Sequence, residues 1–235
     1  MPFSCCRPTC SLALIAAAAT AALVAVNAGN AATDIAPTAS AAKAVTVTAP
    51  AAPIDSTVAP TTFPDSWFYT DRRSGKRYDK PKALEGKAAP TLELTDWIGK
   101  STSLEELKKN RTIVVVDFWA TWCGPCVAAI PKNVKMYDKY KGKNVTIIGV
   151  HDARRGSERM PQMVSSKKIN YPVAVDKKDS TGNGVSTRAW NVSFWPTYAV
   201  IDHKGIVRAS GLLPNRVEDV VKALMDERVK DGSAS

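Results

Sequence analysis

Hydrophobic residues fall into spaced runs after about residue 86, and these runs predict strands that alternate with helices. Residues 113–119 and 144–150 are almost entirely apolar, as is typical of strands buried on both faces of a sheet. Between them the pattern predicts a helix over 124–140, in which Pro131 should cause a kink because proline removes one helical hydrogen bond. A buried strand, a helix and a second buried strand are therefore expected at the centre of the domain.

Shorter elements are expected on either side of this centre. Residues 89–95 alternate between apolar and polar positions like an edge strand, and Ser103 followed by Glu106 has the form of a capping box. Residues 157–168 should be helical, with Met160 and Met163 in the core. The remaining predictions are a strand at 171–175, a helical turn at 185–190 and a hairpin of strands at 197–201 and 205–209.

The last helix is predicted from a single apolar stripe. Val217, Val220, Val221 and Leu224 follow one another at i, i+3, i+4 and i+7. Strands and helices alternate first, and the chain ends with a hairpin and a helix. We therefore expect an α/β fold over residues 86–230, with a mixed central β-sheet flanked by helices on both faces.

The N-terminal 62 residues carry no pattern that could build a core. Residues 1–30 contain an uncharged apolar run followed by small residues, which is the layout of a signal peptide. An uncleaved membrane anchor is the alternative, because the run approaches the ~18 residues that can span a bilayer. Residues 31–62 are rich in Ala, Thr, Pro and Val with almost no charge, so we expect a disordered linker.

Residues 63–85 form an aromatic and basic extension of the domain. Trp67, Phe68 and Tyr69 precede a basic stretch with a Ser74-Gly75 turn, which predicts a small hairpin. Two roles remain open for this segment. It is either an extension packed on the domain by its aromatic side chains or an arm that docks a partner.

The chain of 235 residues has a formal net charge of +10 at pH 7. A basic surface favours acidic proteins, anionic lipid or nucleic acid. Because an exported protein meets little nucleic acid, we interpret the charge as a source of solubility and weak steering. We expect no nucleic-acid partner.

The cysteines divide between the leader and one pair. Cys5, Cys6 and Cys10 lie in the leader, which leaves Cys123 and Cys126 where a buried strand is followed by a helix. The free N–H groups and dipole of a helix N-terminus stabilise a thiolate, so the pKa of Cys123 should fall. Cys126, one turn later, is close enough to form a disulfide with it, and such a dithiol exchanges electrons with other disulfides. Cys123 should be exposed and attack, while Cys126 should be more buried and resolve.

A CxxC pair can also be half of a zinc site, which needs four ligands. The two histidines, His151 and His203, have spacings that fit no zinc finger. We therefore expect no metal and no other cofactor. His151 is expected to make local hydrogen bonds and His203 to be a turn residue.

Residues 116–126, with the sequence Val-Asp-Phe-Trp-Ala-Thr-Trp-Cys-Gly-Pro-Cys, resemble the active-site segment of the thioredoxin superfamily. They look most like the secreted or membrane-tethered TlpA/ResA-like disulfide reductases, and the resemblance covers roughly residues 87–230. It implies a thioredoxin fold and a redox-active Cys123–Cys126 disulfide. It also implies substrate contacts by Trp122, Gly124 and Pro125, with Trp122 covering the cysteine pair.

Asp117 lies in the apolar strand six residues before Cys123. Burial of a carboxylate is costly and raises its pKa toward neutrality. The resemblance to thioredoxin implies that Asp117 lies beneath Cys126 and relays its proton, and the alternative is a strand-end Asp that faces solvent. Many TlpA-like proteins have Asn at this position and Glu three residues after the second Cys, where this chain has Ala129. This difference favours the proton route of thioredoxin, through Asp117, in this chain.

The resemblance assigns the second half of the site to Trp195, Pro196 and Thr197. In the superfamily a proline at this point is cis, faces the cysteines and adjoins an edge that pairs with the substrate backbone, and only X–Pro bonds adopt cis cheaply. Trp195 is larger than the residue usual in the family and should narrow the groove or add an aromatic contact. A trans proline at a strand start is the alternative for Pro196.

These features predict an extracytoplasmic or periplasmic thiol:disulfide oxidoreductase that reduces protein disulfides. The Gly-Pro pair between the cysteines matches thioredoxin, at the reducing end of the series. The TlpA resemblance implies clients such as apocytochrome c or copper-site proteins, a role in cytochrome c maturation and a membrane electron donor. We expect a monomer, anchored to the membrane if the leader is retained.

Two other functions remain open. A peroxiredoxin-like peroxidase needs a Thr two residues before its peroxidatic Cys, and Thr121 fits, but no proline stands in place upstream. A docking module would bind a partner through residues 63–82, with the dithiol in a minor role.

Overall fold

The structure is a computed structural model that describes residues 61–233. These residues fall in the second of two compact units of the chain, Asp55–Ser235. The expected leader (1–30) and nearly all of the expected linker (31–62) lie outside the described residues. Within residues 61–233, no helix is both long enough and apolar enough to cross a membrane.

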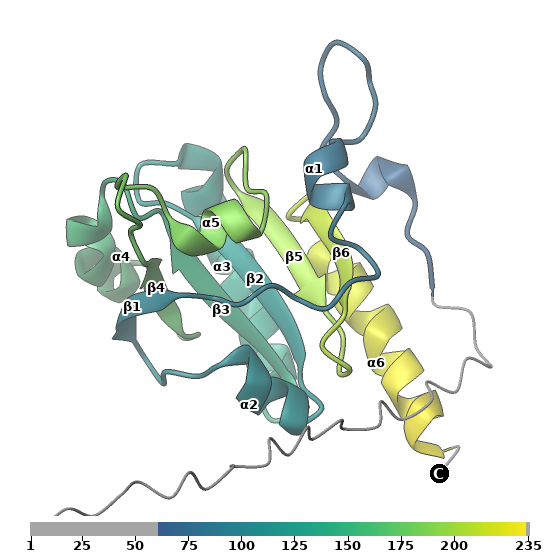
Figure 1. The fold of residues 1–235 in the computed structure, drawn as a ribbon. Helices are drawn as coiled ribbons and strands as arrows, with labels where there is room; N and C mark the ends of the chain where they lie inside the picture. The colour runs from purple at the N-terminus through teal and green to yellow at the C-terminus, as the bar shows by residue number, and fades with distance from the viewer. Residues whose placement is uncertain (1–60, 234–235) are drawn as a thin grey trace, which may run out of the picture. The chain divides into compact units, whose positions relative to one another are not determined.

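The described part of the chain contains a six-stranded mixed sheet in the order β1-β4-β3-β2-β5-β6 (Figure 1). β2, β3 and β4 are parallel, while β1, β5 and β6 pair antiparallel with their neighbours. The strands are β1 (Leu94–Ile98), β2 (Ile113–Trp119), β3 (Val145–His151), β4 (Val173–Asp176), β5 (Thr197–Ile201) and β6 (Val207–Leu212). The prediction of a mixed central sheet is confirmed.

The helices cover both faces of this sheet. They are α1 (Asp79–Lys82), α2 (Leu104–Lys109), α3 (Gly124–Tyr140), α4 (Met160–Ser166), α5 (Val185–Ala189) and α6 (Val217–Ser233), with 3-10 turns η1 (Asp65–Trp67) and η2 (Ser157–Arg159). α3 has the bounds that the sequence predicts and contains Pro131. The predicted cap of α2 is present, because the N–H of Glu106 donates to Ser103 Oγ at 3.2 Å.

Strand β2 shows how the two layers of core arise. Its seven residues are all buried, and their side chains alternate between the faces. Ile113 and Val115 join the cluster under α3 and α6, whereas Val114, Val116 and Phe118 join the cluster under α2 and α5. The predicted stripe of α6 lies in the first cluster, since Val217, Val220, Val221 and Leu224 are at most 1% exposed.

The edge strand begins later than the alternation predicts. Residues 89–93 form no strand, and β1 starts at Leu94. Pro90 has no N–H to donate to a ladder. The segment instead crosses the sheet face between its two edges (Figure 1), with Ala89 and Leu92 packed on the cluster under α2 and α5. The apolar positions of residues 89–93 therefore mark the side of this crossing segment that packs on the sheet.

The predicted helix at 157–168 is divided into η2 and α4, which ends at Ser166. Met160 is 2% exposed, and Met163 packs at the margin of the same core. Their prediction as core residues is confirmed. The strand expected at 171–175 begins at Val173, and the second hairpin strand, expected at 205–209, begins at Val207.

The extension at residues 63–85 lies against β6. Phe68 is 3% exposed and bridges to Leu212, and the N–H of Tyr69 donates to Gly211 O at 3.0 Å. A short hairpin projects beyond this contact, closed by the bridge between Thr70 and Arg77. The aromatic side chains are at least partly buried, which favours a packed extension over a docking arm.

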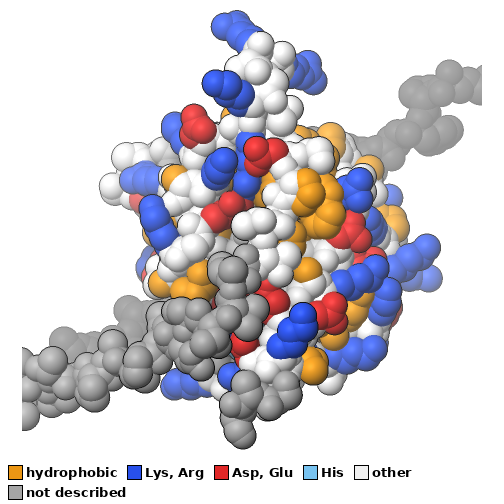
Figure 2. All heavy atoms as spheres, turned by 90° about the vertical axis from the view of Figure 1, so that its right-hand side faces the viewer, with side chains coloured by type: hydrophobic (Ala, Val, Ile, Leu, Met, Phe, Trp, Pro, Cys, Tyr) orange, Lys and Arg blue, Asp and Glu red, His pale blue; other side chains and the backbone are white. Residues whose placement is uncertain are grey.

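Figure 2 shows the face that carries α6 and the extension. Basic and acidic side chains are interspersed over it, and a group of basic side chains lies on the projecting hairpin. On this face, mixed charge of this kind fits the interpretation of the charge as a source of solubility.

The sheet brings three segments to one end. The register pairs Phe118 with Thr197 and Trp119 with His151, so the end of β2, the start of β5 and the end of β3 lie together. α3 begins five residues after β2 at this same end. The cysteine pair and the Pro196 turn therefore lie at one end of the sheet, beside its central strands.

Candidate functional site

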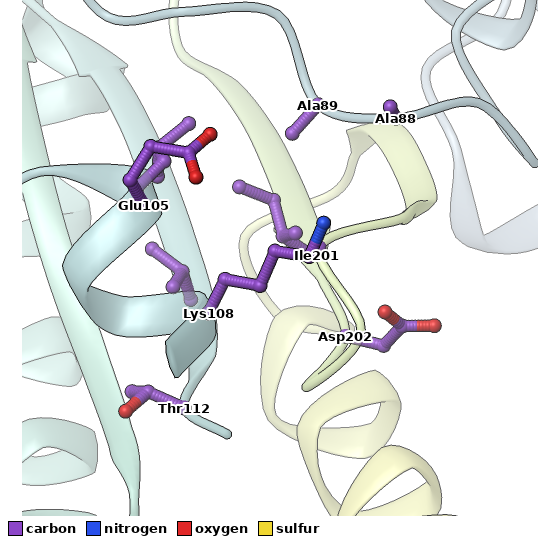
Figure 3. A pocket seen from close by; sticks show the side chains of 10 residues that line it. Ala88, Ala89, Glu105, Lys108, Thr112, Ile201 and Asp202 are labelled. Atoms are coloured by element: carbon purple, nitrogen blue, oxygen red, sulfur yellow. The ribbon is translucent and has the colours of Figure 1, made fainter. Parts of the chain in front are cut away.

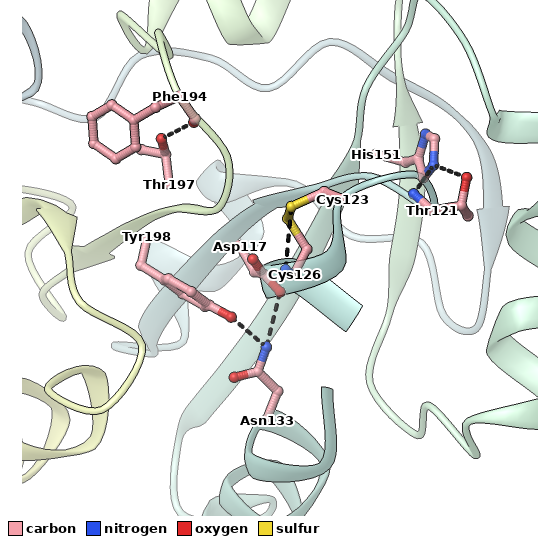
Figure 4. The surroundings of a disulfide bond; sticks show 9 residues. All are labelled: Asp117, Thr121, Cys123, Cys126, Asn133, His151, Phe194, Thr197 and Tyr198. Carbon is pink, nitrogen blue, oxygen red and sulfur yellow. Dashed lines mark hydrogen bonds between the residues drawn. A yellow bond between two sulfur atoms is a disulfide. The ribbon is translucent and has the colours of Figure 1, made fainter. Parts of the chain in front are cut away.

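Cys123 and Cys126 form a disulfide at the N-terminus of α3 (Figure 4). Their sulfur atoms are 2.06 Å apart. Cys123 is the N-cap of the helix, and its Sγ accepts the N–H of Cys126 at 3.2 Å. A sulfur in this position receives a free helix N–H and the positive end of the helix dipole, which both favour a thiolate.

The exposure expected of Cys123 is wrong for the disulfide form. Cys123 is only 5% exposed, against 2% for Cys126. The bond to Cys126 and the N–H contact turn the Cys123 sulfur toward the helix, while Gly124 and Pro125 remain exposed. The order of exposure agrees with the prediction, but its extent does not.

Asp117 is buried within β2, with 2% exposure. Burial raises the pKa of its carboxyl to about 7, and hydrogen bonds from Tyr198 and Asn133 partly oppose this rise. Nδ2 of Asn133 donates to Asp117 Oδ2 at 2.9 Å and to the Tyr198 hydroxyl at 2.9 Å. The solvent-facing alternative for Asp117 therefore does not hold.

Asn133 and Tyr198 are site residues that the sequence analysis missed. Asn133 follows Cys126 by seven residues, so both lie on the buried stripe of α3 that faces β2. An Asn on an otherwise apolar stripe is the sequence feature that could have revealed it. Through Asn133, the carboxyl group of Asp117 is hydrogen-bonded to the helix that carries Cys126.

The peptide bond between Trp195 and Pro196 is cis, as the resemblance implies. Thr197 is 1% exposed, and its hydroxyl donates to Phe194 O at 2.5 Å (Figure 4). Trp195 is partly buried, and its ring meets that of Trp122 edge to face, with centroids 6.0 Å apart. The two halves of the site are thus joined by an aromatic contact.

Trp122 is 38% exposed and is among the few large exposed hydrophobic residues of the described chain. The guanidinium carbon of Arg155 lies 4.6 Å from its ring centroid. His151 accepts the N–H of Thr121 at Nε2 (2.9 Å), and its Nδ1 lies 2.9 Å from Asp152 O. Burial lowers the pKa of His151. The local hydrogen-bonding role predicted for His151 is confirmed.

His203 lies in the turn between β5 and β6, as predicted, but it is buried. Its Nε2 is 3.1 Å from the carboxylate of Asp231 in α6, which packs over this turn. Burial lowers the pKa of His203. Its turn joins the far ends of β5 and β6, so it is not part of the cysteine site.

A pocket of about 60 Å³ also lies at the end of the sheet away from the cysteines (Figure 3). Val114 and Ile201 line it with residues of α2, and these two residues pair at the start of β2. The pocket is too small for a peptide segment. It offers no alternative to the cysteine pair as a site for a protein substrate.

Comparison with known proteins identifies relatives of this site. A family model described as Redoxin matches residues 84–224, which include both cysteines and Pro196. The Thiol-disulfide oxidoreductase ResA of Bacillus thuringiensis is 36% identical over 129 residues, covering 55% of this chain and 70% of that protein. The Thioredoxin-like protein YneN of Bacillus subtilis is 28% identical over 143 residues, covering 60% of this chain and 79% of that protein.

A solved structure of a thiol:disulfide interchange protein is also similar to this chain. The solution structure of a thiol:disulfide interchange protein from Bacteroides sp. matches with a TM-score of 0.52 and 26% identity. The match covers 60% of this chain and 90% of the other. The chain is similar to all of these proteins in the part that contains the cysteine pair.

Proposed function

The chain belongs to the Redoxin family and is a TlpA/ResA-like thiol-disulfide oxidoreductase of the thioredoxin superfamily, and on this premise we propose that it reduces disulfides of client proteins through Cys123 and Cys126. One observation carries the proposal. The two sulfurs share the N-terminus of α3, where a helix N–H already points at Cys123 Sγ. Cys123 is therefore the nucleophile and Cys126 the resolving residue.

The exchange proceeds in two steps. The Cys123 thiolate attacks one sulfur of a client disulfide, a mixed disulfide forms, and the other client sulfur leaves as a thiolate. Cys126 then loses its proton and attacks Cys123 Sγ, which forms the Cys123–Cys126 disulfide and releases the second client sulfur. The client gains two electrons and takes up two protons. A dithiol donor must return two electrons to the chain.

Asp117 is proposed to take the proton of Cys126 in the second step. A general base works best when its pKa lies near the operating pH, and burial raises the pKa of Asp117 to about 7. Asn133 holds the carboxylate from the same helix stripe that carries Cys126. These contacts support a proton route from Cys126 into β2.

The client surface is proposed to surround the disulfide. Trp122, Gly124 and Pro125 are exposed there, and Trp195 is partly exposed. Pro196 and Thr197 are buried, so they form the floor of this surface, and the hydroxyl of Thr197 supports the turn before Pro196. The contact between Trp122 and Trp195 forms one side of the surface.

The location and the clients are proposed from the leader and from the TlpA resemblance. The leader in residues 1–30 favours an exported protein, either freed by cleavage or retained as a membrane-anchored monomer. The TlpA resemblance favours apocytochrome c or copper-site proteins as clients and a membrane donor of electrons. The chain would then take part in cytochrome c maturation or in the assembly of copper sites.

Reduction of insulin disulfides tests the proposal. With dithiothreitol as electron source, the chain should accelerate insulin precipitation, and Cys123→Ser should reduce the rate to the background of dithiothreitol alone. Cys126→Ser, first reduced and then freed of dithiothreitol, should instead accumulate a mixed disulfide with insulin, because the first step remains and resolution is lost. Normal insulin reduction by the Cys123→Ser variant would rule the proposal out.

A further inference from the structure

The loop that follows β3 is fixed against the residues that precede Cys123. Thr121 makes hydrogen bonds to both ends of this loop, from its N–H to His151 Nε2 at 2.9 Å and from its hydroxyl to Gly156 O at 2.8 Å. Gly156 has φ +85°, and a Cβ there would lie 2.6 Å from Thr121 Oγ1 and 3.1 Å from Trp122 Cδ1. The loop and the Thr121-Trp122 segment are therefore held together by two hydrogen bonds and close packing.

Arg155 is an exposed cation of this loop and lies against Trp122, the residue before Cys123. Its guanidinium carbon lies 4.6 Å from the centre of the Trp122 ring, within the range of a cation–π contact. Trp122 directly precedes Cys123, and its ring also meets Trp195. A cation is thus held at the rim of the proposed client surface.

The charge of Arg155 is not neutralised within the described residues. Its loop neighbour Arg154 pairs with Asp152 (3.0 Å), and Arg159 pairs with Glu158 (3.6 Å). No carboxylate of residues 61–233 forms an ion pair with Arg155. The guanidinium can therefore accept an anionic partner from solvent.

We propose that Arg155 is a specificity-determining residue that selects client disulfides flanked by acidic side chains. This inference rests on the proposed reductase function. A client whose sulfur reaches Cys123 passes over Trp122, so a residue next to its cysteine comes near the guanidinium. The net charge of +10 favours the same acidic clients during approach.

The test compares two disulfide-linked peptide pairs that differ only in Glu or Lys on both sides of each cysteine. At low salt the wild-type chain should reduce the Glu pair about two- to fivefold faster in kcat/KM, as one exposed ion pair allows. Arg155→Gln should lower this preference, and Arg155→Glu should lower it further, to what the net charge of the chain alone supports. Added salt should weaken the preference of the wild type.

Lys109→Glu provides a control with the same change in net charge. Lys109 is exposed at the end of α2, beside the start of β2 and away from the cysteines. This variant should keep the wild-type preference. If Arg155→Glu and Lys109→Glu show equal preferences for the Glu pair, the preference arises from the net charge of the protein and the inference is wrong.

A neutral substrate separates this inference from the function on which it rests. Relative to the wild type, Arg155→Glu should lose more activity on the Glu pair than on 2-hydroxyethyl disulfide, because that molecule carries no charge. An equal loss on both substrates would mean that Arg155 acts on the cysteines and does not select clients. If the wild-type chain reduces neither peptide, the reductase function itself fails.

Discussion

A carboxyl group buried in an apolar strand, as in Asp117, holds its proton more tightly than one in water. Here burial raises the pKa to about 7, and the amide of Asn133 limits the rise by donating to Oδ2. At residue scale, Asn133 therefore sets the pH at which Asp117 can accept a proton. It acts as a positioning residue, since it reaches the cysteines only through Asp117.

Replacement of Asn133 by Ala should move the acidic limb of the activity profile to higher pH. Loss of the donor destabilises the charged carboxylate, so the pKa of Asp117 should rise by about one further unit. Insulin reduction at pH 6 should fall several-fold and recover near pH 8.5. The measurement is the initial rate between pH 5.5 and 9.

Met136→Ala is the control for this variant. Met136 is 3% exposed on the same face of α3, and its removal costs packing but removes no hydrogen bond to Asp117. Its pH profile should match that of the wild type. Equal profiles for the Asn133→Ala and Met136→Ala variants would contradict the role given to Asn133.

Single residues differ in how far the sequence reveals them. The apolar run around Asp117 favours burial, but only the structure excludes the solvent-facing alternative, because a residue near the end of a strand can face water. The hydrogen bond from Asn133 depends on the packing distance between α3 and β2, which no local pattern encodes. The low exposure of Cys123 depends on the disulfide itself.

At the scale of elements, the loop after β3 is held in place by close contact with Thr121. Gly156→Ala combines backbone strain with a clash against this residue, because the φ of +85° disfavours any side chain. The variant should lose about 2–4 kcal/mol of unfolding free energy. Urea unfolding followed by circular dichroism measures the loss.

Gly75→Ala separates the two causes. Gly75 has φ +66°, but nothing lies within 4 Å of a Cβ at this position. Its replacement should cost only the backbone term of about 1 kcal/mol. An equal loss in the two variants would show that the loop after β3 is not confined by Thr121.

The long elements follow from the sequence and the short ones only in part. α3 and β2 have strong periods or continuous apolar runs, and both lie where predicted. Residues 89–93 alternate like a strand but cross the sheet face, because the chain must pass from the β6 edge to the β1 edge. The path of residues 89–93 is set by the order of the strands in the sheet and not by the sequence of these residues.

At the scale of the whole molecule, Asp117 couples stability to pH. Its pKa is about 7 in the folded chain against 3.8 ordinarily, so the folded state binds more protons between these values. The contribution of Asp117 to stability is then fully present below pH 3.8 and is lost as the pH rises to about 7. Between pH 5 and pH 8 the oxidised chain should lose about 3 kcal/mol through this group.

Asp117→Asn should remove this loss, because the amide does not titrate. The two unfolding free energies should therefore diverge by about 3 kcal/mol from pH 5 to pH 8, with the variant more stable at pH 8. Urea unfolding of both oxidised proteins at several pH values is the measurement. Parallel profiles would contradict a raised pKa for Asp117.

The mixed sheet with helices on both faces could be predicted from the order of the elements. The extension could not be placed in this way, because Phe68 is buried against β6, where it bridges to Leu212, more than a hundred residues later in the chain. The contact between Arg155 and Trp122 is equally non-local. The surface around the cysteines thus depends in part on contacts between residues that are far apart in the chain.

The reduction potential of the Cys123–Cys126 pair tests the proposed reductase role most directly. It can be measured by equilibration with glutathione redox buffers and thiol alkylation, in a chain whose Cys5, Cys6 and Cys10 are replaced by serine. With Gly-Pro between the cysteines, as in thioredoxin, we expect a potential of about −270 mV. A value of about −120 mV, typical of a strong oxidant, would contradict the reductase role.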